Sequence, residues 1–356
     1  MSTLFSPFQL GPVALRNRVV MAPMTRSRAI DNLPNGLMAA YYGARAAAGL
    51  ILTEGVAPRA EGLGYARIPG LFTDAQQAGW RGVTDAVHAA GGAIFAQLMD
   101  CGRVAHPENL GAGARLLGPS AVAAPGTMWT DRAGAQPMPV PEPMSAVDIA
   151  AAIAGYVGAA RRAMAAGFDG VELHGANGYL IDQFLNLASN RRDDAWGGSL
   201  EGRARFAVEV AAAVAAAVGG ARVGIRLSPH GVFNGMVPDA DTDALYLHLV
   251  DRLNPLGLAY IHLVDHSSMG APPVSDALKD SIRRCFSGAL ILSGGYDRAR
   301  AEADLLANRG DLVAFGRPFL ANPDLVRKLQ TGEALHPPDP ATFYTPGPVG
   351  YTDLPG

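Results

Sequence analysis

The sequence predicts an α/β fold in which residues 1–356 form a single (β/α)8 TIM barrel with an N-terminal cap. Three observations support this prediction. The chain contains eight short apolar runs rich in β-branched residues, most of them are separated by Ala-rich or amphipathic segments of helical length, and no run is followed by a G-x-G-x-x-G turn. Near-continuous apolar strands suit a parallel sheet that is covered on both faces.

The eight expected strands are spaced along the whole chain. They are "RVVMAPM" (18–24), "GLILTEGV" (49–56), "AIFAQLM" (93–99), "GVELHGA" (170–176), "VGIRLSP" (223–229), "LAYIHLVD" (258–265), "ALILSGG" (289–295) and "LVAFGR" (312–317). The expected crossover helices include 74–90, 145–166, 200–219, 240–253 and 297–308. Eight strand-and-helix repeats fit a closed barrel better than an open doubly wound sheet, which usually has fewer strands.

One connection is too long to be an ordinary loop. Residues 100–143 are rich in Gly and Pro, and we expect them to run over the top of the barrel after the third strand. Within this stretch, "GAGAR" (111–115) lacks the following helix and the spacing of a dinucleotide-binding loop.

Composition narrows the class of function. The net charge is −3 and no Lys/Arg block interrupts the chain, so we expect no nucleic-acid binding. Cys101 and Cys285 are far apart and match no metal-ligand spacing, so we expect no metal and a reducing, cytoplasmic location. The N-terminal residues do not read as a signal peptide, and no apolar run approaches the ~20 residues that span a bilayer. For the oligomeric state, we expect either a monomer or a homodimer.

Polar residues and glycines gather where the expected strands end, which is where barrel enzymes place their catalytic groups. Taken singly, each has a structural interpretation, such as an ion pair for Arg226 or a turn for the glycines. Glycines after the last two strands, together with Arg317, also suit a phosphate site. The residues concerned are Thr25, Glu54, Gly55, Gln97, His174, Asn177, Tyr179, Arg226, Gly294, Gly295, Gly316 and Arg317.

In combination, five motifs resemble the Old Yellow Enzyme family of FMN-dependent ene-reductases. They follow one another in the family's order and extend almost from end to end of the chain. The motifs are "LRNRVVMAPMTRSRA", "GLILTEG", "VELHGANGYL", "AFGRPFLANPDLV" and "FYTPGPVGYTD".

The resemblance implies non-covalently bound FMN, with NADPH or NADH as reductant. By this resemblance Pro23, Met24 and Thr25 pack against and hydrogen-bond the flavin ring, and Gly55 allows close backbone approach. Gln97 and Arg226 face the pyrimidine edge, where the guanidinium stabilises the anionic reduced ring. The remaining implied positions are Gly294, Gly295, Gly316 and Arg317 for the phosphate, Phe343 and Tyr344 over the flavin, and Tyr65, Met99 and Tyr344 around the substrate cavity.

The resemblance also assigns roles to the stretch "GVELHGANGYL" (170–180). His174 and Asn177 donate hydrogen bonds to the substrate's carbonyl oxygen, hydride from the flavin reaches the β-carbon, and Tyr179 protonates the α-carbon. The expected partners are small enones, nitroalkenes or similar electrophiles. A satisfied core histidine followed by two turn residues is the structural alternative.

Several positions depart from the family pattern. Many relatives have an aromatic residue at Met99 and a histidine at Asp100, and Trp196 and Gly202 replace the usual Tyr and Asn. A flexible thioether fills space differently from an indole, so the change at Met99 bears on substrate range rather than on the chemistry.

Three rival classes remain to be compared. A barrel reductase with an iron–sulfur cluster needs close-set cysteines, which this chain lacks. A non-redox lyase or isomerase could use the phosphate site, but it would usually want a Lys or a carboxylate at a strand end, where Glu54 is the only acid considered. A flavin-binding protein with a non-enzymatic role is the third alternative.

Overall fold

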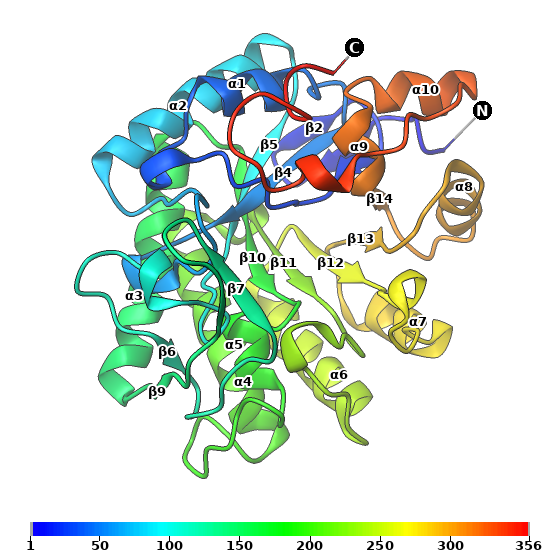
Figure 1. Ribbon diagram of the computed structural model, residues 1–356. Helices are drawn as coiled ribbons and strands as arrows, with labels where there is room; N and C mark the ends of the chain where they lie inside the picture. Colours follow the sequence, from blue (N-terminus) through cyan, green and yellow to red (C-terminus); the bar gives the residue numbers. More distant parts are fainter. Residues whose placement is uncertain (1–2, 355–356) are drawn as a thin grey trace.

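The computed structural model describes residues 3–354, and its central feature is a closed barrel of eight parallel strands (Figure 1). The strand order around the barrel is β10-β11-β12-β13-β14-β3-β4-β5, and it confirms the predicted fold class. The strands are β3 (Val19–Met21), β4 (Leu50–Val56), β5 (Ile94–Leu98), β10 (Gly170–Gly175), β11 (Val223–Leu227), β12 (Tyr260–Val264), β13 (Ala289–Ser293) and β14 (Leu312–Phe315).

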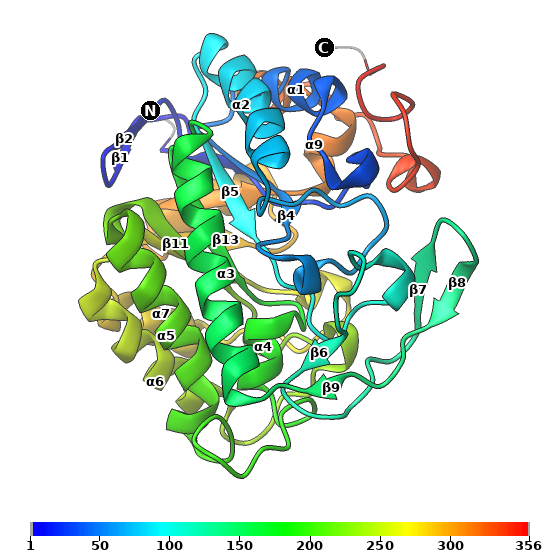
Figure 2. The same ribbon diagram turned by 90° about the vertical axis from the view of Figure 1, so that its left-hand side faces the viewer.

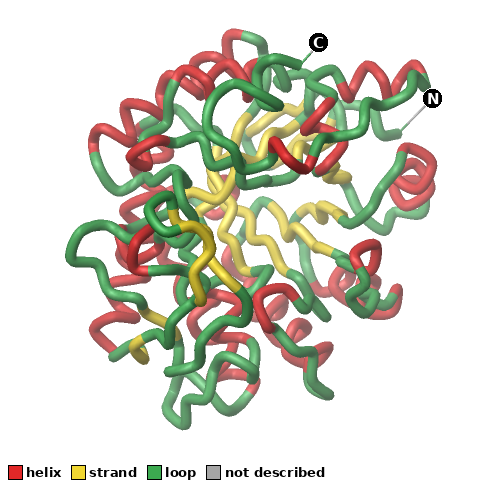
Figure 3. Tube along the Cα trace, viewed as in Figure 1, coloured by secondary structure: helices red, strands yellow, loops and turns green. Residues whose placement is uncertain are grey.

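Helices surround the barrel on its outside, as Figure 3 shows by colour. The five helices expected from the sequence each form within two residues of the predicted ends, and sequence periodicity missed several shorter ones. The helices are α1 (Gly36–Gly43), α2 (Asp74–Ala89), α3 (Ala146–Ala165), α4 (Leu180–Leu185), α5 (Leu200–Val218), α6 (Thr242–Leu253), α7 (Asp276–Cys285), α8 (Arg298–Leu306), α9 (Arg317–Ala321) and α10 (Leu325–Thr331). Among residues 3–354, none of the helices combines the length and apolarity needed to cross a membrane.

Two of the long helices begin at capping boxes. The Thr73 side chain accepts the backbone N–H of Gln76, and the Gln76 side chain accepts the backbone N–H of Thr73, so α2 starts at Asp74. Ser145 and Asp148 make the same reciprocal pair at the start of α3. Each box satisfies backbone donors that a helix N-terminus leaves free, which fixes where these crossover helices begin.

The barrel has an apolar layer inside and a larger apolar shell outside. Phe95 and Tyr260 belong to the interior cluster, whereas Val171 and Leu173 belong to the cluster shared with the surrounding helices. The N-terminal hairpin, β1 (Phe8–Leu10) and β2 (Val13–Leu15), adds its buried leucines to the interior cluster. The hairpin therefore closes the end of the barrel at which the strands begin.

The excursion after β5 lies on the opposite side. It forms β6 (Leu117–Gly118), the antiparallel hairpin β7 (Thr127–Thr130) and β8 (Gly134–Pro137), and β9 (Glu142–Pro143), which pairs with β6. Figure 2 shows β7 and β8 on the same side of the molecule as the C-terminal tail, away from β1 and β2. These two segments therefore frame the end of the barrel at which the strands finish.

The C-terminal tail is attached to the segment that follows β3. Arg28 is 1% exposed and donates hydrogen bonds to backbone carbonyls of the tail at Thr342, Phe343, Gly347 and Val349. Arg26 adds hydrogen bonds to the carbonyls of Phe343 and Gly350. The Tyr351 ring stacks on Tyr41 at 4.0 Å between centroids. We call residues 342–351 with these contacts the latched tail.

We predict that Arg28→Ala releases the latched tail without unfolding the barrel. The substitution leaves several carbonyls without their donor, which costs about 2–3 kcal/mol. Amide hydrogen exchange within residues 342–351 should therefore accelerate by roughly thirty- to a hundredfold, while exchange in the barrel strands stays slow.

Arg115→Ala is the matched control, because Arg115 is half-exposed and its ion pairs with Glu142 and Asp148 lie at the surface. Such pairs contribute about 1 kcal/mol or less. Equal exchange in the tail of both variants would show that Arg28 does not hold it.

Candidate functional site

His174 lies at the end of β10 with its protonation state set by its surroundings. The backbone N–H of Ala176 donates to its Nδ1 at 3.3 Å, so Nε2 carries the proton of the neutral ring. Burial lowers the pKa of His174 well below its ordinary value, and the nearby Arg226, His262 and His266 lower it further. His174 is therefore a neutral hydrogen-bond donor rather than an imidazolium.

The next residues make a tight left-handed turn. Asn177 has φ 61° and Gly178 has φ 76°, and a Cβ at Gly178 would lie 2.8 Å from the Asn234 Cβ. The Asn177 backbone N–H donates to the Ser228 hydroxyl at 3.0 Å, and its carbonyl accepts from the Asn234 side chain at 2.8 Å. Among the described residues, no hydrogen bond occupies the Asn177 side-chain amide, and its Oδ1 is buried without a partner. The backbone of Asn177 is therefore held in place, and its side-chain amide is free to bind a ligand.

Tyr179 completes the trio that the sequence singled out. Its ring lies edge-on to His174 at 4.7 Å, and its hydroxyl is 3.0 Å from the hydroxyl of Tyr65. Burial raises the pKa of Tyr179 well above its ordinary value, so the phenol keeps its proton near neutral pH. The structure thus brings His174, Asn177 and Tyr179 together, with Tyr65 as the next hydroxyl outward.

Sequence reasoning missed the two residues that support this turn. Asp182 accepts the backbone N–H of Gly178 at 2.8 Å, and Gln183 donates to the carbonyls of Gly178 and Cys101. Both side chains are buried on α4. Their signal in the sequence was an acid and an amide inside the apolar stretch "YLIDQFL", where polar residues are expected only with partners.

Arg226 is the charged group at the centre of the strand ends. It is 7% exposed, and among residues 3–354 its buried Nε has no hydrogen-bond partner, nor does Nδ1 of His266 nearby. Burial lowers the pKa of Arg226. A buried guanidinium without an acceptor is costly, so this site suits an anionic or strongly accepting ring system. Pro23, Met24 and Thr25 follow β3 and are partly exposed, which suits packing against such a ring.

Gln97 and Gly55 have neighbours within the protein that the sequence did not indicate. The Gln97 amide donates to Glu172 at 2.8 Å, and the other oxygen of Glu172 is 2.8 Å from His262 Nδ1. All three side chains are buried inside the barrel. A Cβ at Gly55 would lie 2.4 Å from the Met99 thioether, so this glycine makes room for Met99. The flavin contacts of Gln97 and Gly55 stay predictions.

The expected phosphate site lies after β13 and β14, where glycines allow unusual backbone conformations and close packing. Gly294 and Gly295 have positive φ angles, and a Cβ at Gly294 would lie 2.0 Å from the carbonyl oxygen of Asp265. A Cβ built at Gly316 would make only ordinary contacts, with the Met24 sulfur 3.7 Å away, so protein atoms do not crowd this backbone. Arg317 is exposed at the start of α9. Glycine backbone and an available cation fit a phosphate group.

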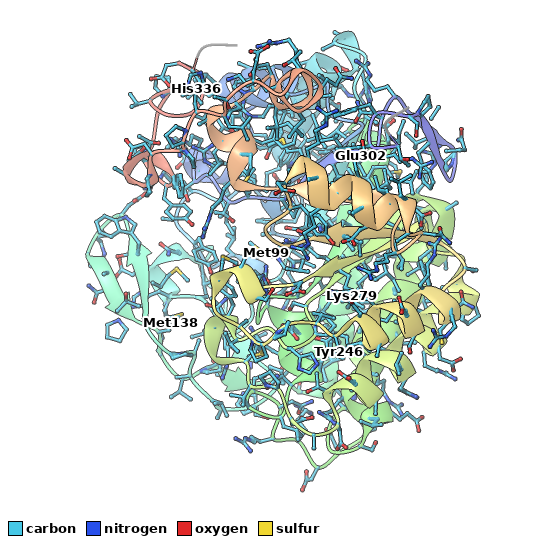
Figure 4. The ribbon with its side chains drawn as sticks, turned by 90° about the vertical axis from the view of Figure 1, so that its right-hand side faces the viewer. Met99, Met138, Tyr246, Lys279, Glu302 and His336 are labelled. Carbon is cyan, nitrogen blue, oxygen red and sulfur yellow. The ribbon has the colours of Figure 1, made fainter. Side chains whose placement is uncertain are left out.

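A cavity of about 700 Å³ lies between the excursion and the latched tail. Tyr65, Tyr179 and Thr25 line it from the barrel, and Met128 and Tyr344 line it from β7 and the tail. Met99 packs instead in an adjoining apolar cluster with Met138, and both are labelled in Figure 4. Phe343 is partly buried beside Tyr344, with a ring-centroid separation of 6.2 Å.

Glu54 is buried away from this cavity. Its carboxylate accepts from the Tyr42 hydroxyl at 3.3 Å and from the backbone N–H of Arg26 at 3.3 Å. Burial raises the pKa of Glu54 to about 7. These contacts give the acid a structural role between β4 and α1. Within residues 3–354, no group of three or more His, Cys, Asp or Glu is arranged to hold a metal ion.

Comparison with known proteins gives matches over almost the whole chain. A model described as the NADH:flavin oxidoreductase / NADH oxidase family matches residues 3–336. Chanoclavine-I aldehyde reductase of Penicillium roqueforti is 46% identical, over 99% of this chain and 96% of that protein. A probable flavin mononucleotide-dependent alkene reductase of Leishmania infantum is 42% identical, over 99% of this chain and 97% of that protein. The solved structure of morphinone reductase is similar with a TM-score of 0.96 at 45% identity, over 99% and 96%.

We predict that His174 stays neutral from pH 6 to pH 8, because burial and the neighbouring Arg226 both disfavour its charged form. Long-range ¹H–¹⁵N correlation spectra of protein labelled at histidine, compared with those of His174→Gln, should assign the proton to Nε2. An imidazolium pattern for His174 at pH 6, or a proton on Nδ1, would contradict the assignment.

Proposed function

Because this chain belongs to the NADH:flavin oxidoreductase / NADH oxidase family, we propose that it works as an FMN-dependent ene-reductase of the Old Yellow Enzyme type. NADH or NADPH is the reductant, and the substrate is an activated C=C bond. The observation that carries this proposal is the group of His174, Asn177 and Tyr179 at one strand end, with the unpaired Arg226 on the next strand.

Family membership also decides between the rival classes. The matching family consists of flavin oxidoreductases, and the curated relatives are named as reductases, one of them of alkenes. A non-redox lyase or isomerase is not supported, and neither is a non-enzymatic flavin protein. A lyase would need a free acid at this strand end, but the Glu54 carboxylate is hydrogen-bonded to Tyr42 and to the backbone of Arg26.

The described residues fit FMN. Arg226 offers a buried charge without an acceptor, and the uncrowded backbone at Gly316 suits a phosphate. Gly294, Gly295 and Arg317 would complete the phosphate contacts, and Thr25 would bind the ring. When bound and reduced, FMN supplies the hydride for the substrate's β-carbon.

In this proposal His174 and Asn177 bind the substrate's carbonyl oxygen. The imidazole donates from Nε2, because Nδ1 is occupied by the N–H of Ala176. The Asn177 amide donates from the turn that follows β10, with its backbone fixed by Ser228 and Asn234. Two fixed donors stabilise negative charge as it develops on the oxygen, and they need no rearrangement during the reaction.

Tyr179 then delivers the proton. Its raised pKa keeps the hydroxyl protonated near neutral pH, so it acts as a general acid toward the α-carbon. The hydroxyl of Tyr65 lies 3.0 Å away and supports the tyrosine oxygen once the proton has left. Both tyrosines line the cavity, so the substrate's C=C bond would lie within it.

We also propose the following finer points. The substrate is a small enone, nitroalkene or similar electrophile, which suits the 700 Å³ cavity. Both cysteines are free, and Cys101 is buried, which suits a reducing cytoplasm. A monomer or a homodimer would serve equally, because all the site residues named here come from one chain.

We predict that His174→Ala and Asn177→Ala each weaken the binding of saturated ketones and slow flavin reoxidation by cyclohexenone. Loss of one preplaced oxyanion donor commonly costs about 2–4 kcal/mol in the transition state. Stopped-flow absorbance measures reoxidation, and perturbation of the flavin spectrum measures binding. If both variants bind ketones and turn over enones like the parent, the donors are assigned wrongly.

We predict that Tyr179→Phe affects only the oxidative half-reaction. The ring remains, so flavin content and flavin reduction by NADPH should stay near those of the parent, while reoxidation by cyclohexenone slows about 10²- to 10⁴-fold. Nitroalkenes should be less affected, because a nitronate is stable enough to take its proton from water. Equal slowing of both half-reactions would remove Tyr179 from the proton transfer.

A further inference from the structure

Asp182 is a buried acid on α4 to which the proposed chemistry gives no part. It is 3% exposed. Its Oδ2 accepts the backbone N–H of Gly178 at 2.8 Å and lies 3.5 Å from the Ser228 hydroxyl. Its Oδ1 lies 3.4 Å from the hydroxyl of Tyr246, which is labelled on α6 in Figure 4. The carboxylate is therefore the common acceptor for a loop, a strand end and a helix.

These contacts lead directly to Asn177. The Ser228 hydroxyl that approaches Asp182 also accepts the backbone N–H of Asn177 at 3.0 Å. Asp182 thus holds the N–H of Gly178 directly and that of Asn177 through one hydroxyl. Both residues have left-handed backbone, which glycine adopts freely but which is less favourable for Asn177, so the contacts around that residue help to keep it there.

The surroundings of Asp182 contain other charges, and most of them are already paired. Arg103 is the cation whose charge lowers the pKa of Asp182, and it donates to the carbonyls of Val122, Ala123 and Asn234. A cavity of about 20 Å³, large enough for about one water, lies beside the carboxylate. The ionisable groups around this cavity are Arg203 paired with Asp239, His230 paired with Asp243, and Tyr246.

We propose that Asp182 is a positioning residue whose ionised carboxylate fixes the Asn177–Gly178 turn, so that the Asn177 amide meets the substrate's carbonyl oxygen. The inference rests on the proposed role of Asn177 as a carbonyl donor. Asp182 itself touches neither substrate nor cofactor. It acts through two backbone N–H groups, and a neutral side chain of the same shape would hold them less strongly, because hydrogen bonds to charged acceptors are the stronger ones.

The acid gives this positioning a pH dependence. Burial raises the pKa of Asp182 to about 6, and the N–H of Gly178, the hydroxyls of Tyr246 and Ser228, and Arg103 limit the rise. Above pH 6 the carboxylate is ionised and the turn is held. Below pH 6 it takes up a proton, and carbonyl binding should weaken. Because the pKa is higher in the folded state than its ordinary value, this group's contribution to stability falls as the pH rises through 6.

The test compares the FMN-loaded parent with Asp182→Asn. The ligand is cyclohexanone, a saturated ketone that does not titrate, and its binding is followed by perturbation of the flavin spectrum between pH 5 and pH 8. The parent should bind about five- to tenfold more weakly at pH 5 than at pH 8, with a midpoint near 6. Asp182→Asn should bind weakly throughout and show no midpoint there. Its melting temperature at pH 8 should not fall, because it removes a buried charge.

Two further variants keep the result interpretable. Ser228→Ala should also weaken binding while retaining the midpoint near pH 6, and it serves alone if Asp182→Asn does not fold. Asp311→Asn is the matched control: Asp311 also accepts a backbone N–H, that of Leu290 at 2.8 Å, but it lies before β14 at the other end of the barrel. That variant should bind cyclohexanone like the parent.

The outcomes separate this inference from the proposed function. Unchanged affinity of Asp182→Asn at pH 8, or a midpoint near 6 that survives in it, would overturn the role of Asp182. So would unchanged affinity in Ser228→Ala. If Asn177→Ala itself binds cyclohexanone like the parent, the proposed carbonyl donor fails instead.

Discussion

Register within the closed parallel barrel is the constraint on which the site depends. In this register His174 lies opposite Arg226, and Arg226 lies opposite His262. Three nitrogen-bearing side chains therefore share one level of the barrel, and their mutual field helps to keep the pKa of His174 low. Glu172 lies two residues earlier on β10, where His262 and Gln97 share its carboxylate. The strand pairing that closes the barrel therefore also helps to keep His174 neutral.

The fold was predictable because its signals are local. Each barrel strand is a short apolar run, and each long crossover helix has a periodic face, so their positions follow from neighbouring residues. The proximity of His174, Asn177 and Tyr179 was predictable for the same reason, since they lie within six residues at the end of β10. Asp182 and Glu172 were not singled out, because an acid inside an apolar run reveals its partner only when distant strands and helices are assembled. The latched tail also depends on contacts between the two ends of the chain.

Polar satisfaction is uneven across the molecule. Arg28 and Gln183 donate hydrogen bonds to backbone carbonyls of the tail and of the loops beside the site. Within residues 3–354, buried side-chain atoms without partners occur at several places, and three of them, Asn177 Oδ1, Arg226 Nε and His266 Nδ1, lie around the strand ends. Such groups are costly unless a ligand completes them, so the three at the strand ends suit a bound ligand.

The latched tail makes the two ends of the chain neighbours at the cavity. Thr25 forms one part of the wall and Tyr344 another, and Arg28 ties the segment after β3 to carbonyls more than 300 positions later in the sequence. During synthesis the first of these segments leaves the ribosome long before the second exists. The cavity wall is therefore completed only after residues 342–351 have been synthesised, and a nascent barrel that has already formed most of its strands still has an open cavity.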